Sequence, residues 1–196
     1  MIARAAAAVG AITAAIQADA AADRKVGAAA GYGSAVTDEQ RYVVIDGRRW
    51  RRRDPNIPDG LAAELVAELM AARRAVGAAG DDATALRAAR DRVQAAKVAL
   101  GERGPAWWDE PSADAVADRA AAAVRALLAH RGPERSICPS DVARVVGGAS
   151  WRRRMDDVRE VARRLVRDGA VVVTQRGATL DADAEWRGPI RIRTAG

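Results

Sequence analysis

The 196-residue chain has few of the residues that usually fill a core, form disulfides or bind metal. It contains no phenylalanine, only two tyrosines, one cysteine and one histidine, His130. A single cysteine excludes an internal disulfide, and a lone histidine without a cysteine cluster does not make a zinc site. No run approaches the ~20 strongly apolar residues of a membrane-spanning helix. We expect a cytoplasmic protein without metal, cofactor or membrane contact.

Sequence signatures of enzymes are also missing. No phosphate-binding loop ending in Gly-Lys-Ser/Thr occurs, and no serine lies in a nucleophile-elbow pattern. The glycine-rich stretch 27–33 lacks both the spacing of a dinucleotide-binding turn and a preceding strand. We therefore do not expect an enzyme.

Positive charge is concentrated in the C-terminal part of the chain. The formal net charge is +6; residues 1–112 carry 16 basic against 15 acidic residues, and residues 113–196 carry 16 against 11. Such an excess favours a polyanionic partner. Of the 32 basic residues, 30 are arginine, an abundance that GC-rich coding also produces.

The N-terminal part is expected to contain an extension followed by two hairpins. Residues 1–38 are rich in alanine and glycine and are predicted to be a disordered extension. In residues 39–111, the β-branched run 42–45, the Asp46-Gly47 turn and the segment 48–53 predict a β-hairpin. Apolar periodicity then predicts helices over about 60–76 and from Asp81 or Asp82 to before Gly101, which form an antiparallel helical hairpin.

Residues 112–196 are predicted to fold as a winged helix-turn-helix. The pattern predicts a helix over 114–130, a second beginning at Cys138-Pro139 and ending at Gly147-Gly148, and a third over 149–169. Strands are expected over 170–175 and 190–193, paired across a loop from Arg176 to Pro189. The predicted fold class is mainly α with small β-hairpins.

Six arginines are candidate nucleic-acid contacts. Counting 100° per residue from Trp151 groups part of this set on one flank of the third helix, which a winged helix places in the major groove. Others lie at the helix start or at the ends of the wing loop, where phosphates would pass. The set comprises Arg152, Arg153, Arg159, Arg163, Arg176 and Arg187.

The same surface also has a purely structural interpretation. Asp156, Asp157 and Glu160 occupy the outermost side of the third helix and would repel phosphate. Several arginines are spaced to form i,i+4 pairs with acids on that helix. Two hypotheses therefore stay open: a DNA- or RNA-binding protein, such as a transcription regulator, and a protein-interaction adaptor without nucleic-acid contact.

Two further features have alternative interpretations. Cys138, at a predicted helix N-cap, is either a redox-sensitive thiol or a small half-buried side chain at a turn. The arginine cluster 48–53 around Trp50 suits phosphate contact, although an exposed hairpin with one buried tryptophan is favoured.

Trp107 and Trp108 are expected to be core anchors. The helical hairpin is expected to serve as a homodimer or protein-partner module.

Four motifs lie in order in the C-terminal part: Ser136–Ala143, Trp151-Arg152 with Met155, Val173–Gly177, and Arg187–Arg191. Over about residues 115–193 they resemble a small bacterial family catalogued as domain of unknown function 3253. The resemblance implies a winged-helix-like fold and no established activity.

A second set of motifs lies within Tyr42–Trp108: Asp46–Trp50, Asp54-Pro55, Ala71–Arg74 and Lys97–Gly104. This segment is similar to another family of small uncharacterised bacterial proteins, some of which carry a biopolymer-transport (Tol) label.

Overall fold

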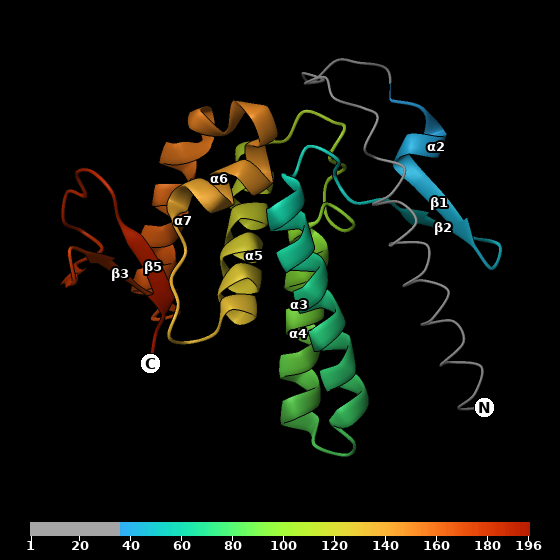
Figure 1. The fold of residues 1–196 in the computed structure, drawn as a ribbon, viewed down its shortest axis with the longest axis horizontal. Coiled ribbons are helices and arrows are strands. Elements are labelled where there is room, and N and C mark those ends of the chain that lie inside the picture. The colour runs from blue at the N-terminus through green and yellow to red at the C-terminus, as the bar shows by residue number, and fades with distance from the viewer. Residues whose placement is uncertain (1–35) are drawn as a thin grey trace. The chain divides into compact units, whose positions relative to one another are not determined.

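The computed structural model describes residues 36–196, which are mainly helical with two small antiparallel sheets (Figure 1). The described residues group into two units, 36–50 and Arg51–Gly196. The predicted extension over residues 1–38 lies, up to residue 35, outside the described part. Within the described part, no helix combines the length and the apolar character needed to cross a bilayer.

The first unit contains the predicted β-hairpin. Helix α2 (Asp38–Arg41) precedes strands β1 (Tyr42–Ile45) and β2 (Arg48–Arg51). Asp46 and Gly47, with φ of 51° and 73°, form the turn, as the Asp-Gly signal predicts. Trp50, expected to be buried, is 38% exposed, and the Arg48 guanidinium lies 5.5 Å from its ring centroid.

The second unit begins with the predicted helical hairpin. Helix α3 spans Asp59–Ala78 and helix α4 spans Ala83–Ala99. Asp82 caps α4 by accepting hydrogen bonds from two backbone amides, as a helix N-cap does. Arg92 of α4 donates two hydrogen bonds to the carboxylate of Glu68 on α3, which is 1% exposed. The prediction of two helices in 60–100 is confirmed.

Three helices and a three-stranded sheet follow. The helices are α5 (Ala113–Arg131), α6 (Pro139–Gly147) and α7 (Met155–Arg167). The strands are β3 (Val171–Gln175), β4 (Ala178–Leu180) and β5 (Arg191–Thr194), in the order β4-β3-β5. Between α5 and α6, Ile137 forms an antiparallel bridge with Ile192, so the chain adds a short fourth segment beside β5.

The predicted third helix is wrong in its first part. Residues Gly148–Arg154 form a 3₁₀ helix, η2, in which Ser150 has non-helical φ and ψ of −91° and 16°. Two glycines and a serine at this point disfavour an α-helical start, and tight 3₁₀ turns are common at helix termini. The α-helix therefore begins only at Met155.

The predicted loop from Arg176 to Pro189 also differs, because it contains β4. Arg176 and Gly177 have φ of 50° and 87° and form a two-residue turn that returns the chain along β3. Such turns usually contain Asn-Gly or Asp-Gly, so an Arg-Gly pair did not predict one.

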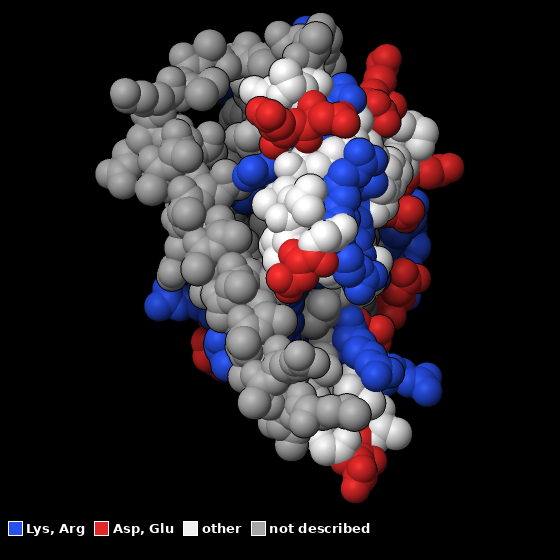
Figure 2. Space-filling model, turned by 90° about the vertical axis from the view of Figure 1, so that its right-hand side faces the viewer, with Lys and Arg blue, Asp and Glu red and all other residues white. Residues whose placement is uncertain are grey.

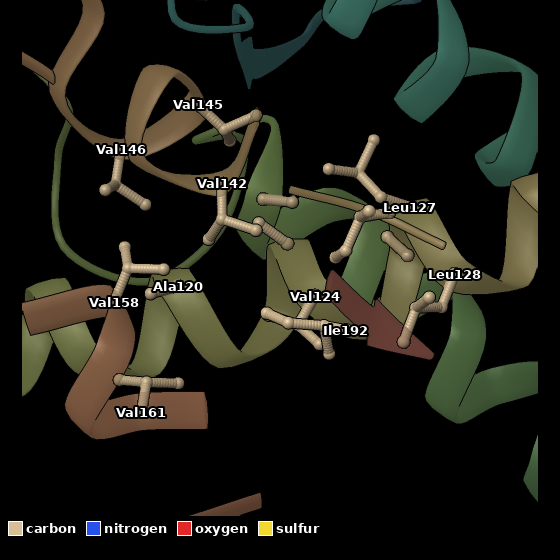
Figure 3. Close-up of a cluster of buried hydrophobic side chains, with 14 of the residues drawn as sticks. Ala120, Val124, Leu127, Leu128, Val142, Val145, Val146, Val158, Val161 and Ile192 are labelled. Carbon is tan, nitrogen blue, oxygen red and sulfur yellow. The ribbon is translucent and has the colours of Figure 1, made fainter. Parts of the chain in front are cut away.

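One hydrophobic core joins the helical hairpin to the C-terminal elements. Figure 3 shows its C-terminal side, where side chains from α5, α6, α7 and β5 meet. Leu65 and Leu69 of α3 and Leu100 after α4 belong to the same cluster and are fully buried. The sequence predicted a domain boundary near residue 111, whereas this core extends across it.

Gly148, at the end of α6, lies close to Asn56 in the loop before α3. Its φ of 49° and ψ of −126° favour glycine, and an added Cβ would lie 2.9 Å from the Asn56 Cβ. We expect Gly148→Ala to lower the free energy of unfolding by about 2–3 kcal/mol in urea titrations, from strain and overlap together. Gly77→Ala, at an open helical position, should instead be neutral or slightly stabilising. Equal effects of the two substitutions would contradict the assigned geometry.

Candidate nucleic-acid interface

Two of the predicted contact residues bind the protein's own loop. Arg159 of α7 donates hydrogen bonds to the carbonyl oxygens of Trp186 and Gly188, at 2.8 and 2.6 Å. One turn later, Arg163 donates to the carbonyl oxygens of Ala182 and Ala184. Arg159 and Arg163 therefore fasten the segment 181–189 to the flank of α7, a role that the sequence did not indicate.

Trp186 strengthens the same attachment. Its ring is 5% exposed and lies 4.3 Å from the Arg163 guanidinium, and its Nε1 donates a hydrogen bond to the Asp181 carbonyl at 2.7 Å. Arg167 continues the row by pairing with Asp183 at 2.7 Å. The hydrogen bond that Arg167 donates to Asp183 is the main reason that the pKa of Arg167 lies above its ordinary value.

The remaining exposed side of α7 has mixed charge. Asp156, Asp157 and Glu160 are exposed there, as the sequence predicted. Asp157 pairs with Arg154 at 3.4 Å, and Glu160 lies 3.8 Å from Arg167. A hollow of about 430 Å³ beside these residues is lined by both acidic and basic side chains. Most of α7 therefore offers no uniformly basic surface to a phosphate backbone.

The segment directly before α7 has a more basic surface than α7 itself. Arg152 and Arg153, both on η2, are exposed. Trp151 beside them is half-buried, and the guanidinium carbons of Arg144 and Arg152 lie 4.7 and 4.6 Å from its ring centroid. The cation–π contacts hold the two guanidinium groups close to the ring while leaving Arg152 accessible. We name Arg144, Trp151, Arg152 and Arg153 the entry cluster.

Arg176 and Arg187, the last two predicted contacts, lie in unlike surroundings. Arg176 is exposed at the turn between β3 and β4. Arg187 is exposed as well, but it pairs with Glu185 at 2.8 Å, and this hydrogen bond raises the pKa of the Arg187 guanidinium. Of the pair, Arg176 is the better placed to bind an external anion.

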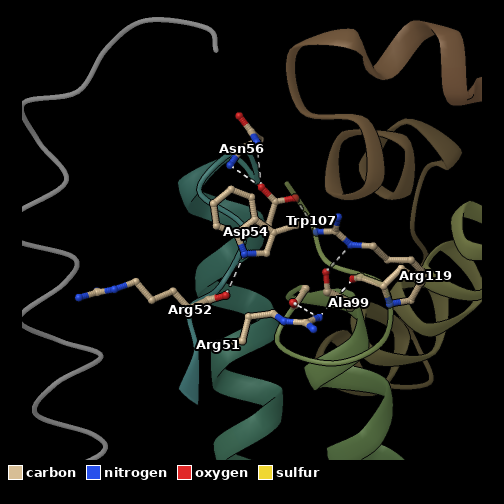
Figure 4. A network of polar contacts seen from close by, with 9 residues as sticks. Arg51, Arg52, Asp54, Asn56, Ala99, Trp107 and Arg119 are labelled. Atoms are coloured by element: carbon tan, nitrogen blue, oxygen red, sulfur yellow. Dashed lines mark hydrogen bonds and ion pairs between the residues drawn. The ribbon is translucent and has the colours of Figure 1, made fainter. Parts of the chain in front are cut away.

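A buried polar network, which the sequence did not reveal, positions the linkers on either side of the helical hairpin (Figure 4). Asp54 is 4% exposed and accepts hydrogen bonds from Arg119 Nη2 at 2.8 Å and from the backbone and side-chain nitrogens of Asn56. Arg119 Nε also donates to the Ala99 carbonyl. The network thus joins α5 to the segments before α3 and after α4.

Neighbouring groups extend this network. Arg51 Nη1 donates to the Gly104 carbonyl at 2.7 Å, and Trp107 Nε1 donates to the Arg52 carbonyl at 3.1 Å. Trp107 is 6% exposed and packs edge-on against Trp108, with ring centroids 5.0 Å apart. The prediction that this tryptophan pair anchors the core is confirmed for Trp107. Every side chain of the network has a structural partner, so we assign it no ligand.

A second ionic cluster joins three helices. Arg131 of α5 donates two hydrogen bonds to Glu64 of α3 and one to Asp141 of α6. The Glu64 carboxylate is the largest cause of the raised pKa of Arg131. Because all three partners are half-buried, this cluster sets the relative positions of α3, α5 and α6.

Cys138 and His130 lie near the ends of two successive helices. Cys138 is the N-cap of α6, as predicted, and is half-buried, with its backbone amide donating to Asp141 Oδ2. His130 is exposed near the end of α5. Among residues 36–196, no group of three or more histidine, cysteine or acidic side chains is arranged to hold a metal ion.

Charge is intermixed elsewhere on the surface. On the face displayed in Figure 2, the described lysine and arginine side chains lie next to aspartate and glutamate side chains.

Sequence comparison identifies the C-terminal segment only. No curated protein is significantly similar to the chain. The segment from α5 through β5 contains the four motifs of the C-terminal part and the three-stranded sheet. Residues 117–195 match the model of a family described as "Protein of unknown function (DUF3253)".

Proposed function

We propose that residues 113–196 form a winged helix-turn-helix that binds DNA or RNA through the entry cluster. The order of elements supports the arrangement: α5, the short segment at Ile137, α6, α7, and then β3, β4 and β5. In such a fold the second and third helices form the helix-turn-helix, and the β3–β4 turn with the following loop forms the wing.

The observation that carries the nucleic-acid assignment is the accessibility of Arg152 and Arg153 on η2, directly before α7. In helix-turn-helix proteins the N-terminal residues of the recognition helix are nearest the bases and phosphates. Arginine donates two parallel hydrogen bonds to a phosphate and stacks well on flat rings. The entry cluster thus supplies charge and a planar surface at the place where that fold meets nucleic acid.

The function is tested by the salt dependence of binding to a fluorescent duplex of about 20 base pairs, between about 50 and 300 mM KCl. Each phosphate contact contributes about 0.9 to the slope of log affinity against log salt. We expect Arg152→Gln/Arg153→Gln to reduce this slope by about 2. Fluorescence anisotropy measures the affinities, and a hairpin RNA of similar length serves as the second probe.

A matched control separates local contact from net charge. Arg87 and Arg90 are exposed on α4, and Arg87→Gln/Arg90→Gln removes the same charge. This control should bind with the parent slope. Equal losses in the two double variants would show that only bulk charge matters and would contradict the entry cluster as the contact surface.

A second candidate function is a protein-interaction adaptor without nucleic-acid contact. It is favoured by the acidic residues on the exposed side of α7 and by the use of Arg159 and Arg163 inside the protein. If the parent protein binds neither duplex nor RNA at about 50 mM KCl, the adaptor becomes the better explanation.

A further inference from the structure

The outer face of the C-terminal sheet carries two arginines that were not among the predicted contacts. In β5, Ile192 is fully buried in the core (Figure 3), whereas Arg191 and Arg193 on either side of it are exposed. Since successive side chains of a strand point to opposite faces, both arginines lie on the face away from the core. Their Cα atoms are about 6.6 Å apart along the strand.

Hydroxyl groups extend this face across the neighbouring strands. Thr174 of β3 pairs with Arg191 of β5, and Thr179 of β4 pairs with Thr174. The three residues therefore form one cross-strand row of hydrogen-bond donors. Val172 pairs with Arg193 in the next row. We name Val172, Thr174, Thr179, Arg191 and Arg193 the sheet face.

The sheet face differs from α7 in having no acidic side chain. None of the residues in β3, β4 or β5 is Asp or Glu. The acid nearest in sequence is Asp181, which directly follows β4, and Asp168 lies in the connection before β3. Arg193 Nη2 donates a hydrogen bond to the Glu134 backbone carbonyl at 3.0 Å, which orients its guanidinium while leaving its charge unneutralised.

We infer that the sheet face binds a phosphodiester backbone running along β5, with Arg191 and Arg193 each contacting one phosphate. The inference rests on the proposed function and adds a second contact surface to it. Charge complementarity supports it, because two arginines and no acid on one face attract a polyanion. Two arginines at alternate positions of one strand can each reach a phosphate of a repeating anionic chain. Threonine hydroxyls donate to phosphate or sugar oxygens, as they do in many protein–DNA contacts.

The test uses the full chain with the double substitution Arg191→Gln/Arg193→Gln. It measures how the affinity of this variant for duplex and single-stranded DNA probes of about 20 nucleotides depends on salt. We expect the slope of log affinity against log salt to fall by about 2 for the duplex and by about 1.4 for the single strand. Both side chains are exposed, so the thermal midpoint should stay within about 2 °C of the parent value.

A second measurement uses the unaltered protein. Phenylglyoxal modifies accessible arginines, and mass spectrometry locates the adducts. We expect the DNA probe to protect Arg191 and Arg193, while Arg87 and Arg90 on α4 react at the same rate with and without it. Unchanged slopes together with unprotected Arg191 and Arg193 would overturn the inference.

The outcomes for the two surfaces are distinguishable. If Arg152→Gln/Arg153→Gln reduces the slope and Arg191→Gln/Arg193→Gln does not, the sheet face is wrong and the proposed function stands. If both reduce it, both surfaces contact the nucleic acid. If the parent protein does not bind either probe, the proposed function fails, and the sheet-face inference fails with it.

Discussion

Arg119→Ala is expected to lower the free energy of unfolding by about 3–5 kcal/mol. Arg119 is the only cationic side chain that hydrogen-bonds to Asp54 within the described residues, at 2.8 Å, and the two side chains are 14% and 6% exposed. Its removal leaves the Asp54 carboxylate buried with only the two donors of Asn56. An uncompensated buried charge costs more than the ion pair itself contributes. Urea unfolding, followed by circular dichroism, measures the change.

Two variants make this expectation specific. Arg125→Ala, at an exposed position on the same helix, removes a similar side chain and should change stability by less than about 0.5 kcal/mol. Asp54→Asn in the Arg119→Ala background removes the stranded charge and should recover part of the loss. If Arg119→Ala is no worse than Arg125→Ala, the network in Figure 4 does not stabilise the fold in the manner described.

Trp186→Ala is expected to cost about 3–5 kcal/mol and to release the segment 181–189 from α7. The ring is almost fully buried, and its loss removes both the packing surface and the hydrogen bond to the Asp181 carbonyl. The carbonyl groups bound by Arg159 and Arg163 lie on either side of Trp186 in the same segment. We therefore expect amide hydrogens in 181–189 to exchange faster, beyond the change in global stability.

The control for this variant lies next to it in sequence. Arg187→Ala removes an exposed side chain that pairs with Glu185 and should leave exchange in 181–189 close to the parent rate. Trp186→Phe should lose less stability than Trp186→Ala, because an aromatic ring remains under Arg163. A Trp186→Ala protein with normal exchange in this segment would mean that the arginines alone hold it.

The sequence predicted the helices well because their apolar residues recur with a helical period. In α5, buried residues such as Ala120, Val124 and Leu127 follow the three- and four-residue spacing that defined the prediction. The N-cap position of Cys138 and the Asp46-Gly47 turn were also predicted, since both depend on local chemistry. Features governed by residues close in sequence were therefore accessible without a structure.

The roles of individual arginines were not accessible in this way. The spacing that places Arg159 and Arg163 on one flank of α7 is correct, but their acceptors are backbone carbonyls more than fifteen residues later. Backbone acceptors leave no trace in the side-chain pattern, so a fastening arginine and a phosphate-binding arginine look alike in the sequence. The pairing of Asp54 with Arg119 was hidden for a similar reason, because 65 positions separate them.

Helix α5 belongs to the segment that matches the family model, yet it packs against α3 and α4 as well as α6 and α7. Two of its arginines, Arg119 and Arg131, find carboxylates at Asp54 and Glu64, outside that segment. The matched segment consequently derives part of its stability from chain that the family model does not describe. A protein with another segment in place of the helical hairpin would need different residues on the side of α5 that packs against α3 and α4. We therefore expect the helical hairpin and α5 to change together during evolution.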